Sequence, residues 1–266
     1  MNLPISTWAV RRHILECSAT SGHGHIPTSF SVVEMVLATY ARMRHFPAQP
    51  RSPERDIFIL SKGHAALGYY CCLAELGYFP WEEVKTFGKA GTRFGCHPDR
   101  LKCEGVEVSS GSLGHGLAVG VGMALAFKIQ KSQRKVFALV GDGEANEGSV
   151  WESVMIAVDR KLNNYTILYD HNRSQTRCLQ IENPSERFQS FGCDVVEVDG
   201  HDMDQITEAL QKEPGARPKV VVCRTVKGFG CATLSSHVFE WHRRSPKPEE
   251  MKTLLAELEE EHAKAV

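Results

Sequence analysis

The sequence predicts an α/β protein with a doubly wound, mainly parallel sheet that is flanked by helices. Short apolar runs, rich in β-branched residues, alternate along the chain with longer segments of helical periodicity. The runs at 136–140 and 166–169 are almost wholly apolar, as expected of parallel strands that helices cover on both faces. With 266 residues, of which 42% are hydrophobic, the chain is long enough for one large domain with a substantial core.

Helices and strands are expected to alternate along the whole chain. Helical periodicity covers 5–20, 31–44 and 65–76, and the first strand, 56–60, precedes the third of these helices. A glycine-rich, irregular stretch at 88–111 leads into an apolar helix at 117–129. After the strand at 136–140, we expect a helix at 149–157, strands at 166–169 and 193–198, a helix at 203–211 with Asp202 as its N-cap, and a strand at 219–223. Residues 247–266 form a charged tail, helical over 247–264, that is expected to be solvated or to face another subunit.

The turn after the 136–140 strand carries the most informative residues. Gly141 and Gly143 allow a sharp turn and the close approach of a ligand to the main chain. The helix that follows offers free N–H groups and a partial positive charge, which suit a phosphate. Asp142, Glu144 and Glu147 would repel a phosphate, however. A divalent cation resolves this conflict because it takes oxygen ligands from both protein and phosphate.

A second polar group follows the next strand, where 166–169 ends at Asp170, His171 and Asn172. Ligands of open α/β sheets bind at the carboxyl ends of neighbouring strands, so Asp142 and Asn172 should converge. Together with a loop carbonyl, assigned to Ser174, they offer half a coordination shell for Mg²⁺ or Ca²⁺ beside a diphosphate. An ordinary turn with solvated acids is the alternative for Gly-Asp-Gly alone. The second group, roughly thirty residues further on, favours the diphosphate–metal site.

These residues resemble a known signature. Gly141-Asp142-Gly143, followed by Asn172, is similar to the thiamine-diphosphate motif, and the flanking sequence resembles the transketolase family. Further segments match that family: Ser21-Gly22-His23, Ser61-Lys62-Gly63-His64-Ala65, Gly95-Cys96-His97-Pro98, Asp199-Gly200-His201-Asp202, Thr225-Val226-Lys227-Gly228-Phe229-Gly230 and Trp241-His242. The resemblance covers nearly the whole chain but only the first transketolase domain. It implies that 1–266 is a single thiamine-diphosphate-binding domain of the diphosphate (PP) type.

The resemblance also implies roles for individual residues. Four histidines would lie at the cofactor–substrate face and move protons near neutral pH, namely His23, His64, His97 and His242. The implied cofactor contacts are His64, Ser112, Leu113, Gly114, Gly141, Asp142, Gly143, Glu144, Asn172 and His242. The metal would be held by Asp142, Asn172 and Ser174, and Glu147 would lie at a subunit contact.

The sequence departs from the family pattern at several of these loops. The affected residues are His25, Ser112, His115, Arg173 and Arg243. Ser112 replaces a proline, His115 a glutamine and Arg243 a glycine, so side chains have changed in a crowded region. We therefore expect a specialised substrate, although the sequence does not identify it.

The implied activity is ketol transfer: a two-carbon unit passes from a ketose, or its phosphate, to an aldose through the thiamine-diphosphate ylid. In this family a pyrimidine-binding domain supplies the glutamate that activates the cofactor. We expect such a domain on a separate subunit, so that the chain is the N-terminal half of a split transketolase, inactive alone and active in an A2B2 heterotetramer. A 1-deoxyxylulose-phosphate synthase-like enzyme, an acyloin-forming enzyme and a catalytically silent cofactor-binding scaffold remain as alternatives.

Composition excludes other partners. A net charge of −1 gives no sign of nucleic acid or of an anionic membrane as a partner. The nine cysteines include no CxxC pair, which is typical of reduced thiols in the cytoplasm. We expect neither a secretory signal nor a membrane-spanning helix, because no apolar run approaches about eighteen residues.

Overall fold

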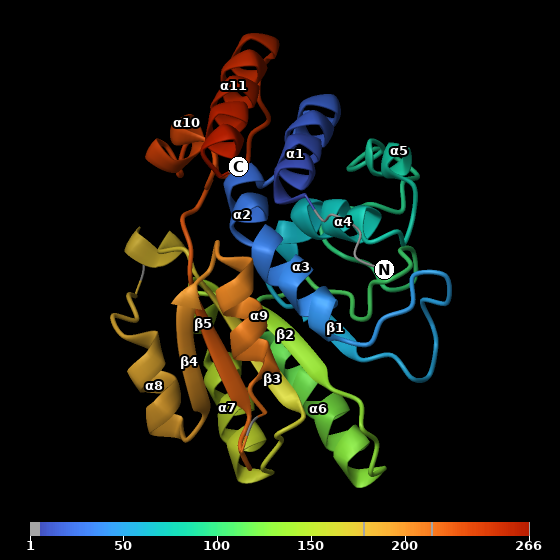
Figure 1. Ribbon diagram of the computed structural model, residues 1–266, viewed down its shortest axis with the longest axis vertical. Coiled ribbons are helices and arrows are strands. Elements are labelled where there is room, and N and C mark those ends of the chain that lie inside the picture. Colours follow the sequence, from blue (N-terminus) through green and yellow to red (C-terminus); the bar gives the residue numbers. More distant parts are fainter. Residues whose placement is uncertain (1–5, 178, 214, 266) are drawn as a thin grey trace.

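The computed structural model describes residues 6–177, 179–213 and 215–265. A sheet with the strand order β1-β2-β3-β5-β4 lies at its centre, and every neighbouring pair of strands runs parallel (Figure 1). The strands are β1 (Ile57–Leu60), β2 (Val136–Gly141), β3 (Tyr165–His171), β4 (Asp194–Asp199) and β5 (Lys219–Arg224). The predicted α/β fold with a parallel sheet is therefore confirmed.

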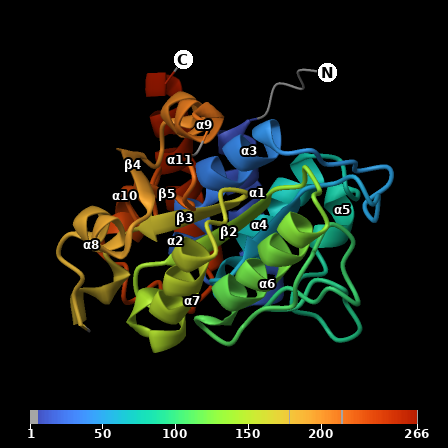
Figure 2. The same cartoon turned by 90° about the horizontal axis from the view of Figure 1, so that it is seen from below.

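Helices cover both faces of the sheet, and Figure 2 shows them on opposite sides of the strands. One face carries α6 (His115–Ile129), α7 (Gly148–Asp159) and α8 (Pro184–Phe191), and the other α3 (Val33–Arg42) and α9 (Met203–Gln211). Successive side chains of a strand point to opposite faces. Ile57 and Ile59 accordingly join the core beneath α6 and α7, whereas Phe58 and Leu60 join the core with α3 and α9. This alternation is why the strands read as continuous apolar runs.

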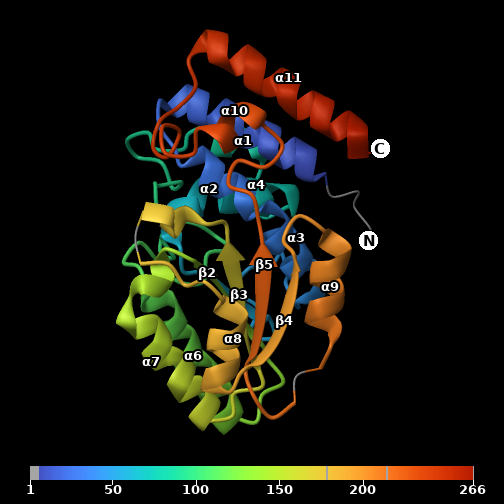
Figure 3. The same cartoon turned by 90° about the vertical axis from the view of Figure 1, so that its left-hand side faces the viewer.

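A third group of helices lies beyond the carboxyl ends of the strands. Its members are α1 (Thr7–Ser21), α2 (Ile26–Ser31), α4 (Ala66–Glu75), α10 (Ala232–Ser236) and α11 (Pro248–Ala265). In Figure 3 the arrowheads of β3 and β5 point toward this group. A ligand bound at the carboxyl ends of the strands would therefore lie between the sheet and these helices.

The charged tail forms a helix, as predicted, but it is anchored rather than merely solvated. Leu254 and Leu258 of α11 are buried in the same core as α1. The rings of Trp8 and His262 stack with centroids 5.1 Å apart. Glu257 of α11 also accepts a hydrogen bond of 2.7 Å from the hydroxyl of Thr233, which lies in α10.

Short helices account for most differences from the sequence-based elements. The sequence analysis does not predict α2, α8, α10 or α5 (Trp81–Val84), which have between four and eight residues each. So few turns show no clear helical periodicity. Single 3₁₀ turns are also present: η1 (Gly63–Ala65), η2 (Glu144–Asn146) and η3 (Ser174–Arg177). Because η2 intervenes, α7 does not begin directly at the Gly-Asp-Gly turn, contrary to the expectation from the sequence.

Several boundaries agree closely with the sequence. Asp202 is the N-cap of α9, as predicted, and its side chain accepts hydrogen bonds from the amides of Asp204 and Gln205. Residue 5, the first of the first predicted helix, and residue 266 lie outside the described residues. None of the helices described here has the length and apolar character needed to cross a membrane.

Candidate functional site

The ends of β2 and β3 bring together the residues that were predicted to hold a metal. In the sheet Gly141 pairs with Asp170, so the residues after each strand emerge side by side. The amide of Asp142 donates to the carbonyl of Asp170 over 3.2 Å. Asn172 follows at the end of β3, and its Oδ1 accepts a hydrogen bond of 3.0 Å from the Ser174 amide. Asp142 and Ser174 both line a cavity of about 260 Å³.

Asp142 is a buried carboxylate with an incomplete set of partners. Its side chain is 1% exposed, and Oδ1 accepts a hydrogen bond of 2.6 Å from the Gly143 amide. Oδ2 is buried and has no hydrogen-bond partner. Burial, followed by the nearby charge of Asp170, raises the pKa of Asp142 to about 6. An unpaired carboxylate oxygen in this position fits a divalent cation, which would take up the buried negative charge.

The rest of a metal shell would have to come from neutral oxygens and from a ligand. Among the described residues, no three His, Cys, Asp or Glu side chains gather as a metal site. Asn172 offers an amide oxygen that faces Ser174, because its Nδ2 donates to Asp170 over 2.8 Å and to Ser31 over 3.3 Å. The donor set is thus one carboxylate with amide, hydroxyl and carbonyl oxygens, which suits Mg²⁺ or Ca²⁺ rather than a softer metal.

Asp170 and Lys62 form a buried ion pair directly behind this site, and sequence reasoning missed it. Both side chains are almost fully buried. Asp170 also accepts hydrogen bonds from Ser31, Asn172 and Thr225. Burial would raise the pKa of Asp170, but the Lys62 ammonium and these donors hold it below its ordinary value. The partners lie 108 positions apart in the chain, so no local pattern reveals the pair.

Glu144 connects three loops around the cavity. Its Oε1 accepts hydrogen bonds from the Ser61 hydroxyl at 2.5 Å and the Gly114 amide at 2.9 Å. Its Oε2 accepts from the Gly141 amide at 3.2 Å. Both oxygens are therefore occupied by protein donors, and burial raises the pKa of this carboxyl. Glu144 lines the cavity, but what it does in the structure is fix the loops that surround it.

Three histidines meet on the far wall of the site. The His25 ring lies 5.4 Å from that of His64 and 5.2 Å from that of His242, centroid to centroid. Burial, and then the neighbouring cations, lowers the pKa of His25 to about 4 and takes that of His64 well below its ordinary value. Burial and Lys227 also lower the pKa of His242. All three imidazoles are therefore neutral at pH 7 and can accept or donate a proton.

The other two predicted histidines lie apart from this group of three. The ring of His23 packs against Phe87 at 5.1 Å, and both of its nitrogens lie 3.9 Å from the sulfur of Cys96. It is His25, which was noted only as a departure from the family pattern, that touches His64 and His242. His97 lies nearer to the group, because its charge lowers the pKa of His25. Burial and Arg243 lower the pKa of His97 itself.

Lys227 is a second functional residue that the sequence analysis did not single out. Its Nζ lies 3.2 Å from Nδ1 of His242 and 3.5 Å from Oγ of Ser174. Burial, and then the charge of Lys62, lowers its pKa to about 8. Lys227 thus links the histidine group to the proposed metal loop. Its place in a family-like Thr-x-Lys-Gly-x-Gly segment was the available signal.

The cavity itself is lined by residues from both predicted sets. They are Lys62, His64, Leu113, Gly141, Asp142, Gly143, Glu144, Ser174 and His242. A Cβ placed on Gly143 would meet no atom within 4 Å, so there is room for a ligand beside this residue. Ser112 and Glu147 are exposed at the surface near its edge.

A parallel sheet with its polar site at the carboxyl ends of the strands defines the class of α/β domains that bind phosphorylated ligands there. Within this class, the family described as "Transketolase, thiamine diphosphate binding domain" matches residues 9–258. The chain belongs to this transketolase family. The predicted relationship to transketolase is therefore confirmed.

Curated relatives and solved structures agree with this assignment. One of the named subunits of apulose-4-phosphate transketolase from Actinobacillus succinogenes is 40% identical over 95% of this chain and 94% of its own length. The 6-deoxy-6-sulfo-D-fructose transketolase subunit SqwG from a Clostridium species is 36% identical over 96% and 95%, respectively. The transketolase structure from Campylobacter jejuni superposes with a TM-score of 0.83 at 25% identity. It is matched over 97% of this chain but only 43% of its own length, so this chain spans less than half of that enzyme.

Proposed function

We propose that the chain is the diphosphate- and metal-binding subunit of a split transketolase. The enzyme would transfer a two-carbon ketol unit from a ketose, or a ketose phosphate, to an aldose. The observation that supports this most directly is the buried Oδ2 of Asp142, which has no partner at the carboxyl edge of the sheet. Relatives that are named as single subunits of a transketolase, and that this chain matches over nearly their full length, support the split organisation.

Thiamine diphosphate with Mg²⁺, or Ca²⁺, is the proposed cofactor. Asp142, Asn172 and Ser174 would hold the metal, and the diphosphate would lie against the Gly141–Gly143 turn. The remaining predicted contacts are His64, Ser112, Leu113, Gly114, Glu144 and His242. When bound, the cofactor supplies the carbanion-stabilising chemistry that no side chain offers.

The histidines of the chain would manage protons on the sugar. His64 and His242 are neutral, stand at the cavity wall and belong to the predicted catalytic set. We add His25 to this set because its ring contacts both of them. His97 and His23 keep their predicted roles at the substrate entrance, although the packing of His23 against Phe87 favours His25 for direct contact.

A separate pyrimidine-domain subunit would supply the activating glutamate. The paired helices α6 and α7 offer a surface for it, since Val119, Ile129, Met155 and Ile156 are large apolar side chains exposed on them (Figure 2). Glu147, exposed at the start of α7, lies at the edge of this surface, as a subunit contact requires. An A2B2 heterotetramer would bury such faces twice. The free cysteines of the described part suit a cytoplasmic enzyme.

Reconstitution tests this proposal. The chain is purified, supplied with Mg²⁺ and thiamine diphosphate, and assayed for ketol transfer with and without the protein encoded next to it. The donors are a pentulose phosphate, apulose 4-phosphate and 6-deoxy-6-sulfo-D-fructose. Activity is expected only in the mixture. Activity of the chain alone would contradict the split organisation, and bound cofactor without turnover of any donor would favour a silent scaffold.

A further inference from the structure

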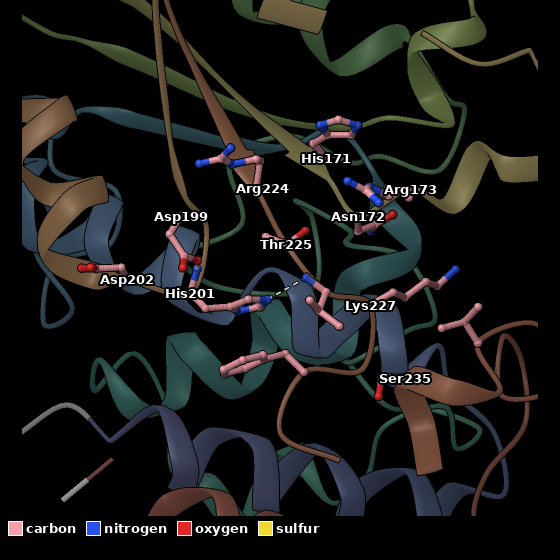
Figure 4. Close-up of a pocket in the computed structure, with 13 residues that line it drawn as sticks. His171, Asn172, Arg173, Asp199, His201, Asp202, Arg224, Thr225, Lys227 and Ser235 are labelled. Atoms are coloured by element: carbon pink, nitrogen blue, oxygen red, sulfur yellow. Dashed lines mark hydrogen bonds between the residues drawn. The ribbon is translucent and has the colours of Figure 1, made fainter. Parts of the chain in front are cut away.

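His201 lies outside the cofactor cavity, in a second and larger one. This cavity has a volume of about 790 Å³ and opens at the carboxyl ends of β3, β4 and β5 (Figure 4). The His201 side chain is only 7% exposed. Its ring stacks on Phe229 with centroids 3.8 Å apart and an angle of 11° between the planes. So well-packed a ring has one orientation.

Both ring nitrogens of His201 are used in hydrogen bonds. The amide of Val226 donates to Nε2 over 2.8 Å, as the dashed line in Figure 4 shows. A backbone N–H can only donate, so Nε2 must be unprotonated. The proton of the neutral ring therefore sits on Nδ1, which lies 3.2 Å from Oε2 of Glu34 and donates to it. The network assigns a single tautomer.

Glu34 is itself held rigidly. Arg11 of α1 contacts both oxygens of the Glu34 carboxylate, at 2.6 and 2.7 Å. Both side chains are 3% exposed, and Arg11 donates a further bond of 3.1 Å to the carbonyl of Phe30. Bidentate contacts of this kind fix orientation as well as charge. His201 thus connects a fixed, buried ion pair to the loop that follows β5.

That loop, residues 225–230, carries Lys227. The Lys227 ammonium reaches His242 and Ser174 on the opposite side of the loop. One further backbone bond, from the Gly228 amide to the carbonyl of Pro27 at 3.1 Å, ties the loop to α2. The bond to His201 falls one residue before Lys227, where it determines the direction in which that side chain leaves the loop.

We infer that His201 is a positioning residue, which holds the 225–230 loop so that Lys227 faces the cofactor site. The inference rests on the proposed function only in the role given to that site. His201 does not line the cofactor cavity, and its two nitrogens are already engaged. It is therefore not a catalytic residue, and it acts through Val226 and Lys227.

Two amide substitutions separate the two bonds of His201. In His201→Asn the side-chain amide reaches about as far as Nδ1, so it can donate to Glu34 but not accept from Val226. In His201→Gln the amide oxygen reaches about as far as Nε2 and can accept from Val226. Each variant loses the stacked ring, so a role in packing alone would affect both equally.

Hydrogen exchange followed by mass spectrometry is the first measurement, because it needs neither cofactor nor partner. Loss of one backbone hydrogen bond should speed exchange in the 225–230 segment about tenfold in His201→Asn. Exchange there should stay within about twofold of wild type in His201→Gln, and β5 should be unchanged in both. Equal exchange in wild type and His201→Asn, or equal acceleration in both variants, would overturn the inference.

Titration with thiamine diphosphate and Mg²⁺, in the presence of the partner, is the second measurement. The cofactor Kd should rise about tenfold in His201→Asn and remain within about threefold in His201→Gln. If the exchange rates behave as expected but wild type binds no cofactor, the proposed function fails while the positioning role stands. If His201→Asn does not fold, the nitrogen NMR signals of the wild-type imidazole decide: a proton on Nε2 would contradict the network, and one on Nδ1 supports it.

Discussion

Two buried carboxylates of this chain, Glu34 and Asp142, are opposites. Both are nearly inaccessible, with exposures of 3% and 1%. The oxygens of Glu34 are met by two Arg11 nitrogens and by His201, and although burial would raise its pKa, the charge of Arg11 lowers it to about 2. Asp142 receives one backbone hydrogen bond and leaves Oδ2 unpaired, and burial raises its pKa to about 6.

The difference indicates which charges belong to the scaffold and which face a ligand. A fully paired buried charge is complete within the chain and fixes the arrangement of α1, α3 and the loop after β4. A partly paired one is costly to keep ionised until something else binds to it. Removing the two carboxylates should therefore have opposite effects on stability and on binding.

Glu34→Gln should have the largest effect on stability. The variant leaves the Arg11 guanidinium buried without a counter-charge, which costs about 3–5 kcal/mol of unfolding free energy. Urea unfolding of the chain measures the loss. Glu240→Gln is the matched control, because Glu240 forms an exposed pair with Arg244 and should change stability by about 0.5 kcal/mol or less. Similar effects of the two substitutions would remove the distinction between scaffold and surface pairs.

The same carboxylate predicts a pH dependence. Because the folded pKa of Glu34, about 2, lies below its ordinary value, its contribution is fully present above about pH 4.5 and is lost as the pH falls toward 2. The stability gap between wild type and Glu34→Gln should therefore narrow by up to about 3 kcal/mol between pH 5 and pH 2. Thermal unfolding of both proteins across this range measures the gap. A gap that widens on acidification would show that the pairing with Arg11 does not stabilise the folded state.

Asp142→Asn should affect binding and leave folding intact. The amide keeps the shape of the side chain but removes the one anionic ligand of the proposed metal site. Affinity for thiamine diphosphate with Mg²⁺ should fall at least about a hundredfold, or roughly 2.7 kcal/mol. Without ligand, the variant should be as stable as wild type or more so at pH 7, since no buried charge remains.

Calorimetric titration and urea unfolding, each run on the same preparations, test both halves of this prediction. Asp159→Asn, at the exposed end of α7, is the control and should change neither quantity. Unchanged cofactor affinity in Asp142→Asn would show that the metal lies elsewhere.

The sequence predicted the sheet and its order of elements because burial on both faces leaves a local mark. The 136–140 and 166–169 runs are apolar in succession, and the structure places them as neighbouring strands. The Gly-Asp-Gly turn and Asn172 could be placed together for the same reason, since parallel strands end at one edge. What was missed is non-local. Neither the pairing of Lys62 with Asp170 nor that of Glu34 with His201 follows from any spacing in the chain.

The histidines show the limit most clearly. His23 stands in the family-like Ser-Gly-His segment, and sequence spacing alone favours it over His25. Two residues further on, the chain turns into α2, and it is the His25 ring that contacts His64 and His242. A register difference of two residues within one loop cannot be read from composition or periodicity. Side-chain contacts are needed to decide between the two.

The contrast between paired and unpaired charge extends to two adjacent arginines, and it gives the smallest expected effect. Arg244 pairs with Glu240 and Glu250 at 2.8–3.0 Å and lies 3.5 Å above the Trp241 ring. Arg243 is exposed and, within the described part of the chain, has no carboxylate in ion-pair contact. Arg243 is close enough to lower the pKa values of His25, His97 and His242, to which burial contributes more.

Arg243→Ala should therefore weaken the binding of an anionic substrate without weakening the fold. We expect KM for a ketose phosphate to rise about three- to tenfold, as for the loss of one exposed charge-assisted contact, with kcat within about twofold. KM for erythrulose, a ketose without charge, should not change. Arg244→Ala is the matched control, and it should lower the unfolding free energy by about 1 kcal/mol and leave both KM values alone. If Arg243→Ala raised KM equally for charged and uncharged ketoses, Arg243 would be shaping the entrance rather than recognising an anion, and an unpaired charge would not by itself mark a ligand contact.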